Sequence, residues 1–268
     1  MPRAVTVTCR VLPGMDELSA ASAELFTAAV SAAVSARGVA RVAISGGNTP
    51  RTMFALLADP NGAYFARIAW DKLHLFWVDE RCVPPADKES NYRMTREAML
   101  DHVPLAASQV HRMEGELEPE VAASRYEAAI RNEFRLEGAE TPVFDLVLLG
   151  MGDDGHTASL FPHTQAIHEL GRIVVANHVP QKATWRITLT WSVINRGREV
   201  FFQIAGADKA EVLHNILLGP YEPEKWPSQL IRPASGKLTL LLDTAAAAML
   251  PVPSGAAGSE RVATLELS

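Results

Sequence analysis

Short apolar runs alternate with longer amphipathic segments along most of the chain. The apolar runs have the length of β-strands, and they lie at residues 5–11, 39–44, 73–78, 144–149, 186–190, 198–205 and 238–242. The segments between them predict helices at residues 15–36, 49–59, 91–100, 121–134, 208–218 and 243–250. Strands this apolar are typical of a mostly parallel sheet with helices on both faces. The pattern therefore predicts an α/β fold.

The domain organisation follows from the same pattern. Residues 1–250 contain no internal repeat or clear linker, so we expect one α/β domain there. Residues 251–268 are rich in Pro, Gly and Ala and are predicted to form a loose tail. Two signals mark helix ends. Gly38 suits the C-terminal cap of the first helix, and Thr49-Pro50 suits the N-cap and first position of the second.

The composition narrows the classes of partner. The 268 residues carry a formal net charge of −6, and no Lys/Arg cluster is dense enough to follow a nucleic-acid backbone. The N-terminus lacks the apolar stretch of a signal peptide, and no apolar run predicts a membrane span. The two cysteines, Cys9 and Cys82, are too few for a disulfide framework, which favours the reducing cytoplasm. The oligomeric state is open, and a monomer is compatible with the sequence.

Ligands of such sheets bind beyond the carboxyl ends of the strands, and three segments occupy that place. The first is Ser45-Gly46-Gly47-Asn48-Thr49-Pro50, between a strand and a helix. Its adjacent glycines let backbone N–H groups approach an anion, and the helix N-terminus adds a favourable dipole. The segment predicts a phosphate or carboxylate cradle at Ser45, Gly46, Gly47 and Thr49. The same residues also suit a tight turn without a ligand.

The second segment is Asp79-Glu80-Arg81, three consecutive charges at the end of an apolar strand. Arg81 can bind phosphate through two parallel hydrogen bonds. Asp79 can orient a donor or hold a substrate hydroxyl, so it is a candidate catalytic residue. A solvated strand end with a surface ion pair would have the same sequence.

The third segment runs from Gly150 to Pro162, and its first half contains three glycines, two aspartates and His156. A histidine takes and returns a proton near neutral pH, so His156 is the candidate general base. Asp154, two residues earlier, can fix the tautomer of its ring. The G-x-G-x-x-G spacing alone would indicate dinucleotide binding, but no convincing acidic partner for the ribose follows.

Other chemistries have little support in the sequence. No two histidines are four residues apart and no Cys/His cluster has zinc spacing, so no metal is expected. Ser45, Ser159 and Ser192 lie outside any Gly-x-Ser-x-Gly motif, which argues against a serine hydrolase.

Together these segments resemble the 6-phosphogluconolactonase family. The resemblance rests on the Ser-Gly-Gly run, on Trp77 to Arg81 with Ser90-Asn91-Tyr92 after it, and on Leu149 to Pro162. Two later runs match in order and spacing, Arg186 to Thr190 and Gly206 to Ala210. The most specific part is the Gly-His-Thr-Ala-Ser-Leu-Phe-Pro run.

The resemblance implies a three-layer α/β/α fold with a mostly parallel, Rossmann-like sheet of the NagB/RpiA/CoA-transferase-like type. It implies hydrolysis of 6-phospho-D-glucono-1,5-lactone to 6-phospho-D-gluconate, the second step of the oxidative pentose phosphate pathway, without a metal or organic cofactor. By matching positions, His156 takes the place of the family's base, and Arg81 with the glycine loop takes that of the phosphate site. Lys209 and Arg186 are further residues carried over for phosphate.

Two other functions remain open. Glucosamine-6-phosphate deaminases belong to the same wider group and typically read Gly-His-Ile-Ala-Phe-Asn-Glu-Pro at the histidine. Here Phe161 stands in place of the acid, and Arg81 stands in place of an aromatic residue after Asp-Glu. Both differences favour the lactonase. A non-catalytic sugar-phosphate-binding module could dispense with His156, so the retention of His156 in its full motif favours an enzyme.

Overall fold

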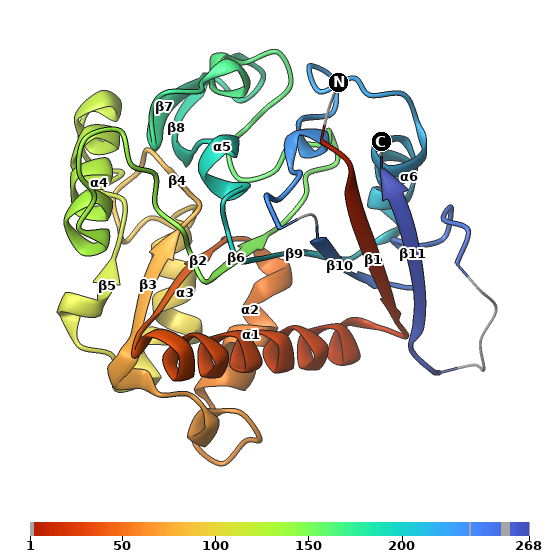
Figure 1. Cartoon of the computed structure of the whole chain (residues 1–268), viewed down its shortest axis with the longest axis horizontal. Helices are drawn as coiled ribbons and strands as arrows, with labels where there is room; N and C mark the ends of the chain where they lie inside the picture. The colour runs from red at the N-terminus through yellow and green to blue at the C-terminus, as the bar shows by residue number, and fades with distance from the viewer. Residues whose placement is uncertain (1–2, 236, 253–257, 268) are drawn as a thin grey trace.

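The chain is organised around one large sheet (Figure 1). The computed structural model describes residues 3–235, 237–252 and 258–267. The strand order is β11-β1-β10-β9-β6-β2-β3-β5. These strands are β1 Val5–Leu12, β2 Ala40–Ile44, β3 Leu73–Trp77, β5 Val110–His111, β6 Leu146–Leu149, β9 Glu199–Ile204, β10 Lys237–Asp243 and β11 Arg261–Leu267. Every pairing is parallel except that of β11 with β1, which confirms the predicted mostly parallel sheet.

Helices cover both faces of this sheet. They are α1 Met15–Arg37, α2 Asn48–Ala58, α3 Asn91–Ala98, α4 Pro119–Phe134, α5 Trp191–Ile194 and α6 Ala210–Leu218. Side chains of α1, α2 and α3 share a hydrophobic core with Leu75, whereas α4, α5 and α6 share another with the next residue, Phe76. Successive residues of a strand point to opposite faces, so the two cores lie on opposite sides of the sheet. The predicted three-layer α/β/α fold is therefore confirmed.

A small antiparallel sheet stands beside α4 with strand order β4-β8-β7. Its strands are β4 Asp79–Arg81, β7 Val174–Val179 and β8 Thr184–Leu189. The charged triplet was expected at the C-terminal end of the apolar strand at residues 73–78. It forms instead a short strand of this second sheet, separated from β3 only by Val78.

Helix α1 is long and apolar enough, by length and composition, to cross a membrane. In the structure it lies along the sheet, and Leu18, Phe26 and Val30 are completely buried in the core that it shares with β2 and β3. This is the packing of a core helix in a globular protein. Its C-terminal cap is Gly38, in the left-handed conformation as predicted.

The C-terminal tail is partly a strand. Residues 261–267 form β11, which pairs along its whole length with Val5 to Val11 of β1, so the predicted loose tail is wrong for these residues. Every second residue of β11 is half-buried, and the strand itself contains no Pro or Gly, because those residues of the tail lie before it, at 251–258. Residues 253–257 and 268 of the predicted tail lie outside the described residues.

Two predicted helix features are also wrong. Residues 244–249 form turns and no helix. The carboxylate of Asp243 accepts hydrogen bonds from the N–H groups of both Ala246 and Gly206, and so connects this segment to the loop after β9. Helix α2 begins at Asn48 with Gly47 as its N-cap, so Thr49 lies within the first turn.

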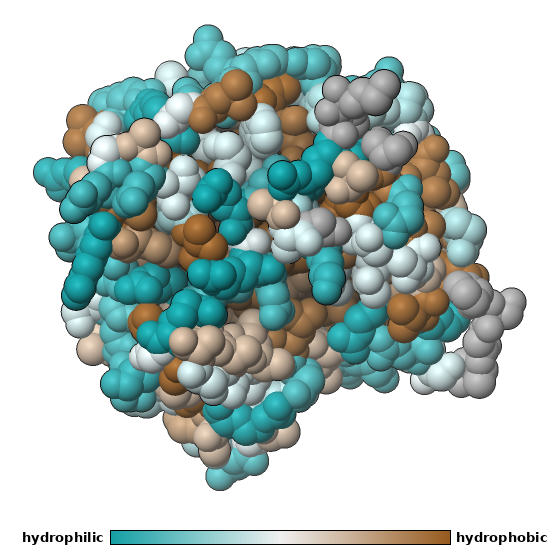
Figure 2. Space-filling model, viewed as in Figure 1, coloured by the Kyte–Doolittle hydropathy of each residue, from teal (hydrophilic) through white to brown (hydrophobic). Residues whose placement is uncertain are grey.

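Hydrophilic residues cover much of the face seen in Figure 2, with hydrophobic residues in small groups between them. Scattered exposure of this kind is normal for a folded protein in water. Cys9 is buried in β1 and Cys82 is half-buried, and both are free thiols, as the low cysteine number predicted.

Candidate active site

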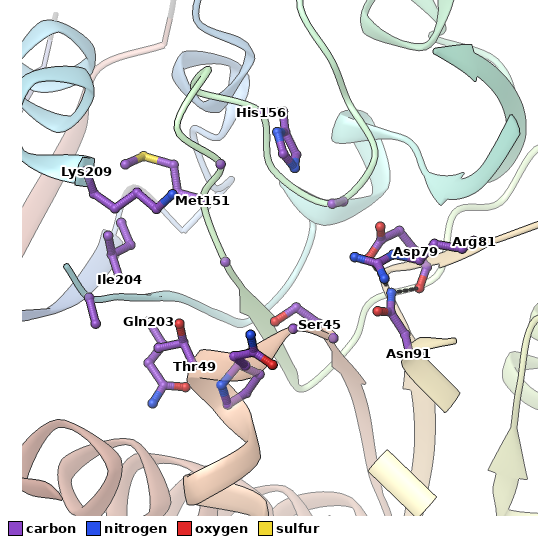
Figure 3. A pocket seen from close by; sticks show the side chains of 18 residues that line it. Ser45, Thr49, Asp79, Arg81, Asn91, Met151, His156, Gln203, Ile204 and Lys209 are labelled. Carbon is purple, nitrogen blue, oxygen red and sulfur yellow. Dashed lines mark hydrogen bonds between the residues drawn. The ribbon is translucent and has the colours of Figure 1, made fainter. Parts of the chain in front are cut away.

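A cavity of about 300 Å³ lies at the carboxyl ends of β9, β6, β2 and β3, which are neighbours in the sheet. Each strand contributes the loop that follows it, so residues far apart in sequence meet here (Figure 3). The lining brings together most of the predicted site residues, namely Ser45, Gly46, Gly47, Thr49, Asp79, Arg81, His156 and Lys209. Two predicted residues lie outside this lining. Arg186 lines an adjoining cavity, and Asp154 stands behind His156.

The glycine loop is shaped by close packing. A Cβ atom on Gly46 would lie 1.9 Å from Oδ1 of Asn91, so only glycine fits there without displacing that side chain. Gly47 has φ +99°, a conformation that side chains rarely adopt. Helix α2 begins directly after Gly47. This N-cap glycine has no side chain that could accept hydrogen bonds from the first N–H groups of the helix. These groups remain available to an anion in the cavity.

His156 is held by two contacts. Its Nδ1 lies 2.5 Å from Oδ1 of Asp154, and its ring stacks on Phe161 with centroids 4.0 Å apart. Burial raises the pKa of Asp154, but its hydrogen bonds with His156 and the charge of His156 outweigh burial, so the pKa lies below its ordinary value. The ionised carboxylate can only accept, so we assign the proton to Nδ1. The free lone pair is then on Nε2, the other ring nitrogen.

The glycines before His156 serve this arrangement. A Cβ atom on Gly152 would lie 2.1 Å from Nδ1 of His156, and one on Gly155 would lie 2.8 Å from the ring of Trp226. Gly155 also has φ +76°. The G-x-G-x-x-G spacing therefore makes room for the histidine and its loop, which is a different use from the dinucleotide turn.

Asp79 is buried beside the cavity, with 8% of its surface exposed. Its Oδ2 accepts a hydrogen bond from Ser159 (2.6 Å) and its Oδ1 accepts one from Asn91 (3.3 Å). These donors leave each oxygen further capacity to accept a hydrogen bond, since a carboxylate oxygen has more than one acceptor position. Asp79 can therefore also hold a substrate hydroxyl.

Glu80 has a structural role. Its buried carboxylate accepts hydrogen bonds from the backbone N–H groups of Arg81, Asn91 and Tyr92, each at 2.8 Å, and from the hydroxyl of Ser90. Burial raises the pKa of Glu80 above its ordinary value, although these hydrogen bonds act in the opposite direction. Glu80 thus ties the start of α3 to β4 and points away from the cavity that Asp79 and Arg81 line.

Arg81 and Arg186 face each other across two antiparallel strands. They are register partners in the pairing of β4 with β8. Within the described residues neither forms an ion pair, although Arg81 donates to the backbone carbonyl of Glu89 (2.5 Å). Burial, and then the charge of Arg81, lower the pKa of Arg186. Like charges directly opposite destabilise a sheet, so this pair favours an anion between the two side chains.

Lys209 lies on the other side of the cavity from Arg81 (Figure 3). Its ammonium group forms an ion pair with Asp208 at 2.8 Å, and 19% of the side chain is exposed. The structure divides the predicted phosphate ligands into two groups at opposite sides of the cavity.

The comparisons with known proteins identify the family. The family model of glucosamine-6-phosphate isomerases/6-phosphogluconolactonase matches residues 13–240. The chain belongs to this family. A 6-phosphogluconolactonase of Nostoc sp. is 38% identical over 246 residues, which are 91% of this chain and 99% of the relative. One of Mycobacterium tuberculosis is 38% identical over 247 residues, which are 90% and 97% of the two chains.

Solved structures agree with this membership. The 6-phosphogluconolactonase from Trypanosoma cruzi superposes with a TM-score of 0.79 at 31% identity, covering 94% of this chain and 97% of the other. That from Trypanosoma brucei has a TM-score of 0.78 at 30% identity, covering 92% and 99%. The family fold implied by the sequence motifs is thus the observed one.

Two polar residues that line the cavity, Asn91 and Gln203, were not predicted as site residues from the sequence. Asn91 donates to both the backbone and the carboxylate of Asp79. Gln203 lies in β9 with 2% of its surface exposed, and within the described residues both its amide atoms lack a hydrogen-bond partner, as does the hydroxyl of Ser45. A polar residue within the apolar run 198–205 was the signal that could have found Gln203.

Proposed function

We propose that this chain hydrolyses 6-phospho-D-glucono-1,5-lactone to 6-phospho-D-gluconate, with His156 as the general base. The observation that carries the proposal is the Asp154–His156 pair at the wall of a cavity that also contains cationic side chains. The relatives named 6-phosphogluconolactonase support the same activity. The reaction belongs to the oxidative pentose phosphate pathway. The two free thiols are compatible with the reducing cytoplasm, which we propose as its setting.

The proposed reaction moves one proton through His156. Nε2 removes a proton from water as the water oxygen attacks the lactone carbonyl carbon, and the imidazolium forms beside the carboxylate of Asp154. The tetrahedral intermediate then collapses, the bond between the carbonyl carbon and the ring oxygen breaks, and the imidazolium gives its proton to that oxygen. Asp154 holds the tautomer and stabilises the charged ring, as the acid of a Ser-His-Asp triad does.

The phosphate group, in this proposal, lies between Arg81 and Arg186, next to the glycine loop. The support is electrostatic, because a dianion relieves the repulsion between two arginines that are register partners and form no ion pair within the described residues. Gly46 and Gly47 line the same cavity as Arg81, so the N–H groups at the start of α2 can reach the remaining oxygens. Lys209, across the cavity, then contacts the sugar ring, and Asp79 holds one of its hydroxyls.

Variants of the two cationic sides test this assignment. Arg81→Ala and Arg186→Ala each remove a charge-assisted contact to phosphate, which is typically worth about 1.5–3 kcal/mol, or about 10- to 100-fold in kcat/KM. We expect that loss with the phosphorylated lactone and a much smaller one with unphosphorylated glucono-1,5-lactone. Lys209→Ala, the matched control, should affect both substrates alike. Equal losses on both substrates for Arg81→Ala would contradict the phosphate assignment.

Phe161 argues against the alternative function, a glucosamine-6-phosphate deaminase. This residue occupies the position of the deaminase acid, and its ring stacks on His156 at 4.0 Å. An aromatic ring cannot relay a proton, whereas deamination of an amino sugar needs several proton transfers.

A direct comparison of substrates separates the proposed reaction from its alternatives. We expect accelerated hydrolysis of freshly prepared lactone, measured by coupling 6-phosphogluconate to its dehydrogenase, with the spontaneous rate subtracted. We expect no ammonia release from glucosamine 6-phosphate. Ammonia release would support the deaminase. Binding of 6-phosphogluconate without any acceleration would support the non-catalytic module.

A further inference from the structure

A second group of ligand-type side chains lies on the sheet, away from the lactone cavity. His74 belongs to β3, His111 belongs to the edge strand β5, and Glu133 lies in the last turn of α4. All three are partly buried. His74 is at the start of β3, whereas the candidate active site is beyond the end of that strand. The two groups are therefore at opposite ends of the sheet.

The three donor atoms have the spacing of ligands that share one ion. Nδ1 of His74 lies 3.1 Å from Nε2 of His111 and 3.3 Å from Oε2 of Glu133, and the three donor atoms all lie within 4.8 Å of one another. Two atoms bound tetrahedrally to one zinc ion at its usual bond lengths are about 3.3 Å apart. Two of the three separations already match this value, and a small side-chain movement brings the third atom to it.

Hydrogen bonding alone accommodates these contacts less well. Nδ1 of His74 carries either one proton or one lone pair. As a donor it must share its single N–H between Glu133 and His111, and as an acceptor it must place its lone pair against the carboxylate. A cation in the centre would use the lone pairs of all three side chains together.

Neighbouring residues hold two of these side chains in place, as hydrogen bonds from surrounding groups hold the ligands of a metal ion. Oε1 of Glu133 accepts a hydrogen bond from Arg41 (2.9 Å), which leaves Oε2 directed to the histidines. The ring of His111 stacks on Phe76 with centroids 4.3 Å apart and planes 8° from parallel, which fixes its orientation. Both held side chains thus present their donor atoms to the same point.

We propose that His74, His111 and Glu133 bind a divalent transition metal ion of the zinc class. Two imidazoles and one carboxylate suit zinc, whereas Mg²⁺ and Ca²⁺ prefer sites made of oxygen ligands. The carboxylate is already shared with Arg41, which further favours an ion that binds imidazole nitrogen strongly. Three protein ligands leave a fourth position to water. The ion would join β3, the two-residue edge strand β5 and the end of α4, and so stabilise this side of the fold.

The test uses the full chain after treatment with a chelator. Zn²⁺ and, separately, Mg²⁺ are titrated by calorimetry, and Co²⁺ is added as a spectroscopic probe. We expect one Zn²⁺ per chain, a rise of several degrees in Tm, no comparable effect of Mg²⁺, and the visible absorption bands of four-coordinate Co²⁺. His111→Gln should weaken Zn²⁺ binding at least 10-fold and abolish the rise in Tm.

A matched control distinguishes this site from binding at other surface histidines. His168 lies 3.2 Å from Glu224 in an exposed pair, so His168→Gln removes a similar side chain and should leave Zn²⁺ affinity unchanged. Glu133→Gln is a second variant that keeps an oxygen for Arg41, and it should also lose binding. Circular dichroism of the metal-free variants checks that they fold. No stoichiometric binding by the unaltered chain, or the same affinity in His111→Gln and Glu133→Gln, would overturn the proposal.

Discussion

Replacement of His156 by alanine is expected to lower kcat for the phosphorylated lactone by about 10²- to 10⁴-fold, the usual contribution of a positioned acid–base group. The reason is that the same ring removes the proton from water and later protonates the ring oxygen. The measurement is the coupled 6-phosphogluconate assay, in which spontaneous hydrolysis sets the lower limit of the observable rate.

The control for this variant separates catalysis from binding. His178→Ala removes an exposed histidine of β7 and should leave kcat and KM unchanged. Calorimetry with 6-phosphogluconate should give similar affinities for the unaltered chain and for His156→Ala, because His156 acts on water and the phosphate contacts remain. If the variant kept its kcat, His156 could not be the base, and if it lost only affinity, His156 would be a binding residue.

Asp154→Asn is expected to have the second largest effect, also about 10²- to 10⁴-fold in kcat, with little change in overall structure. The amide is neutral, so it cannot stabilise the imidazolium that forms during attack. It can also donate to Nδ1, which moves the ring proton to Nε2 and removes the base. Because the pKa of Asp154 lies below its ordinary value, the native carboxylate stays ionised near neutral pH.

Asp153→Asn is the matched control, since it makes the same chemical change at the adjacent, exposed aspartate. It should retain nearly full activity. Nitrogen chemical shifts of labelled histidine report the tautomer directly, and we expect the Nδ1–H form in the unaltered chain and a loss of that preference in Asp154→Asn. Equal kinetic effects of the two variants, or an unchanged tautomer together with unchanged kcat, would argue against the proposed role of Asp154.

The sequence was informative where burial imposes a strong pattern. The runs that became β2, β3, β6 and β9 are continuous and apolar, because these strands are covered on both faces, and their order along the chain with the helices between them predicts a parallel sheet. Since loops at one edge of such a sheet meet, the glycine loop, Asp79 and His156 could be expected in one cavity.

Features that depend on contacts between segments far apart in the sequence could not be predicted from it. Strand β11 is short and follows a Pro- and Gly-rich segment at 251–258, and only its pairing with β1 at the edge of the sheet distinguishes it from a tail. The opposition of Arg81 and Arg186 needs the register of β4 with β8, and the stacking of Phe161 on His156 needs the backbone path between them. The group of His74, His111 and Glu133 has no local spacing in the sequence, because three separate elements bring it together.

The second sheet has a consequence for how such a site can change. Both arginines belong to β4 and β8, whereas the base, its aspartate and the glycine loop follow strands of the main sheet. With the phosphate bound to both arginines as proposed, a small displacement of one sheet against the other would alter the distance between the phosphate and Nε2 of His156, and leave the hydrogen bond to Asp154 intact. The distance from the proposed phosphate site to His156 and the pairing of His156 with Asp154 therefore depend on different sheets, so a change in one can leave the other in place.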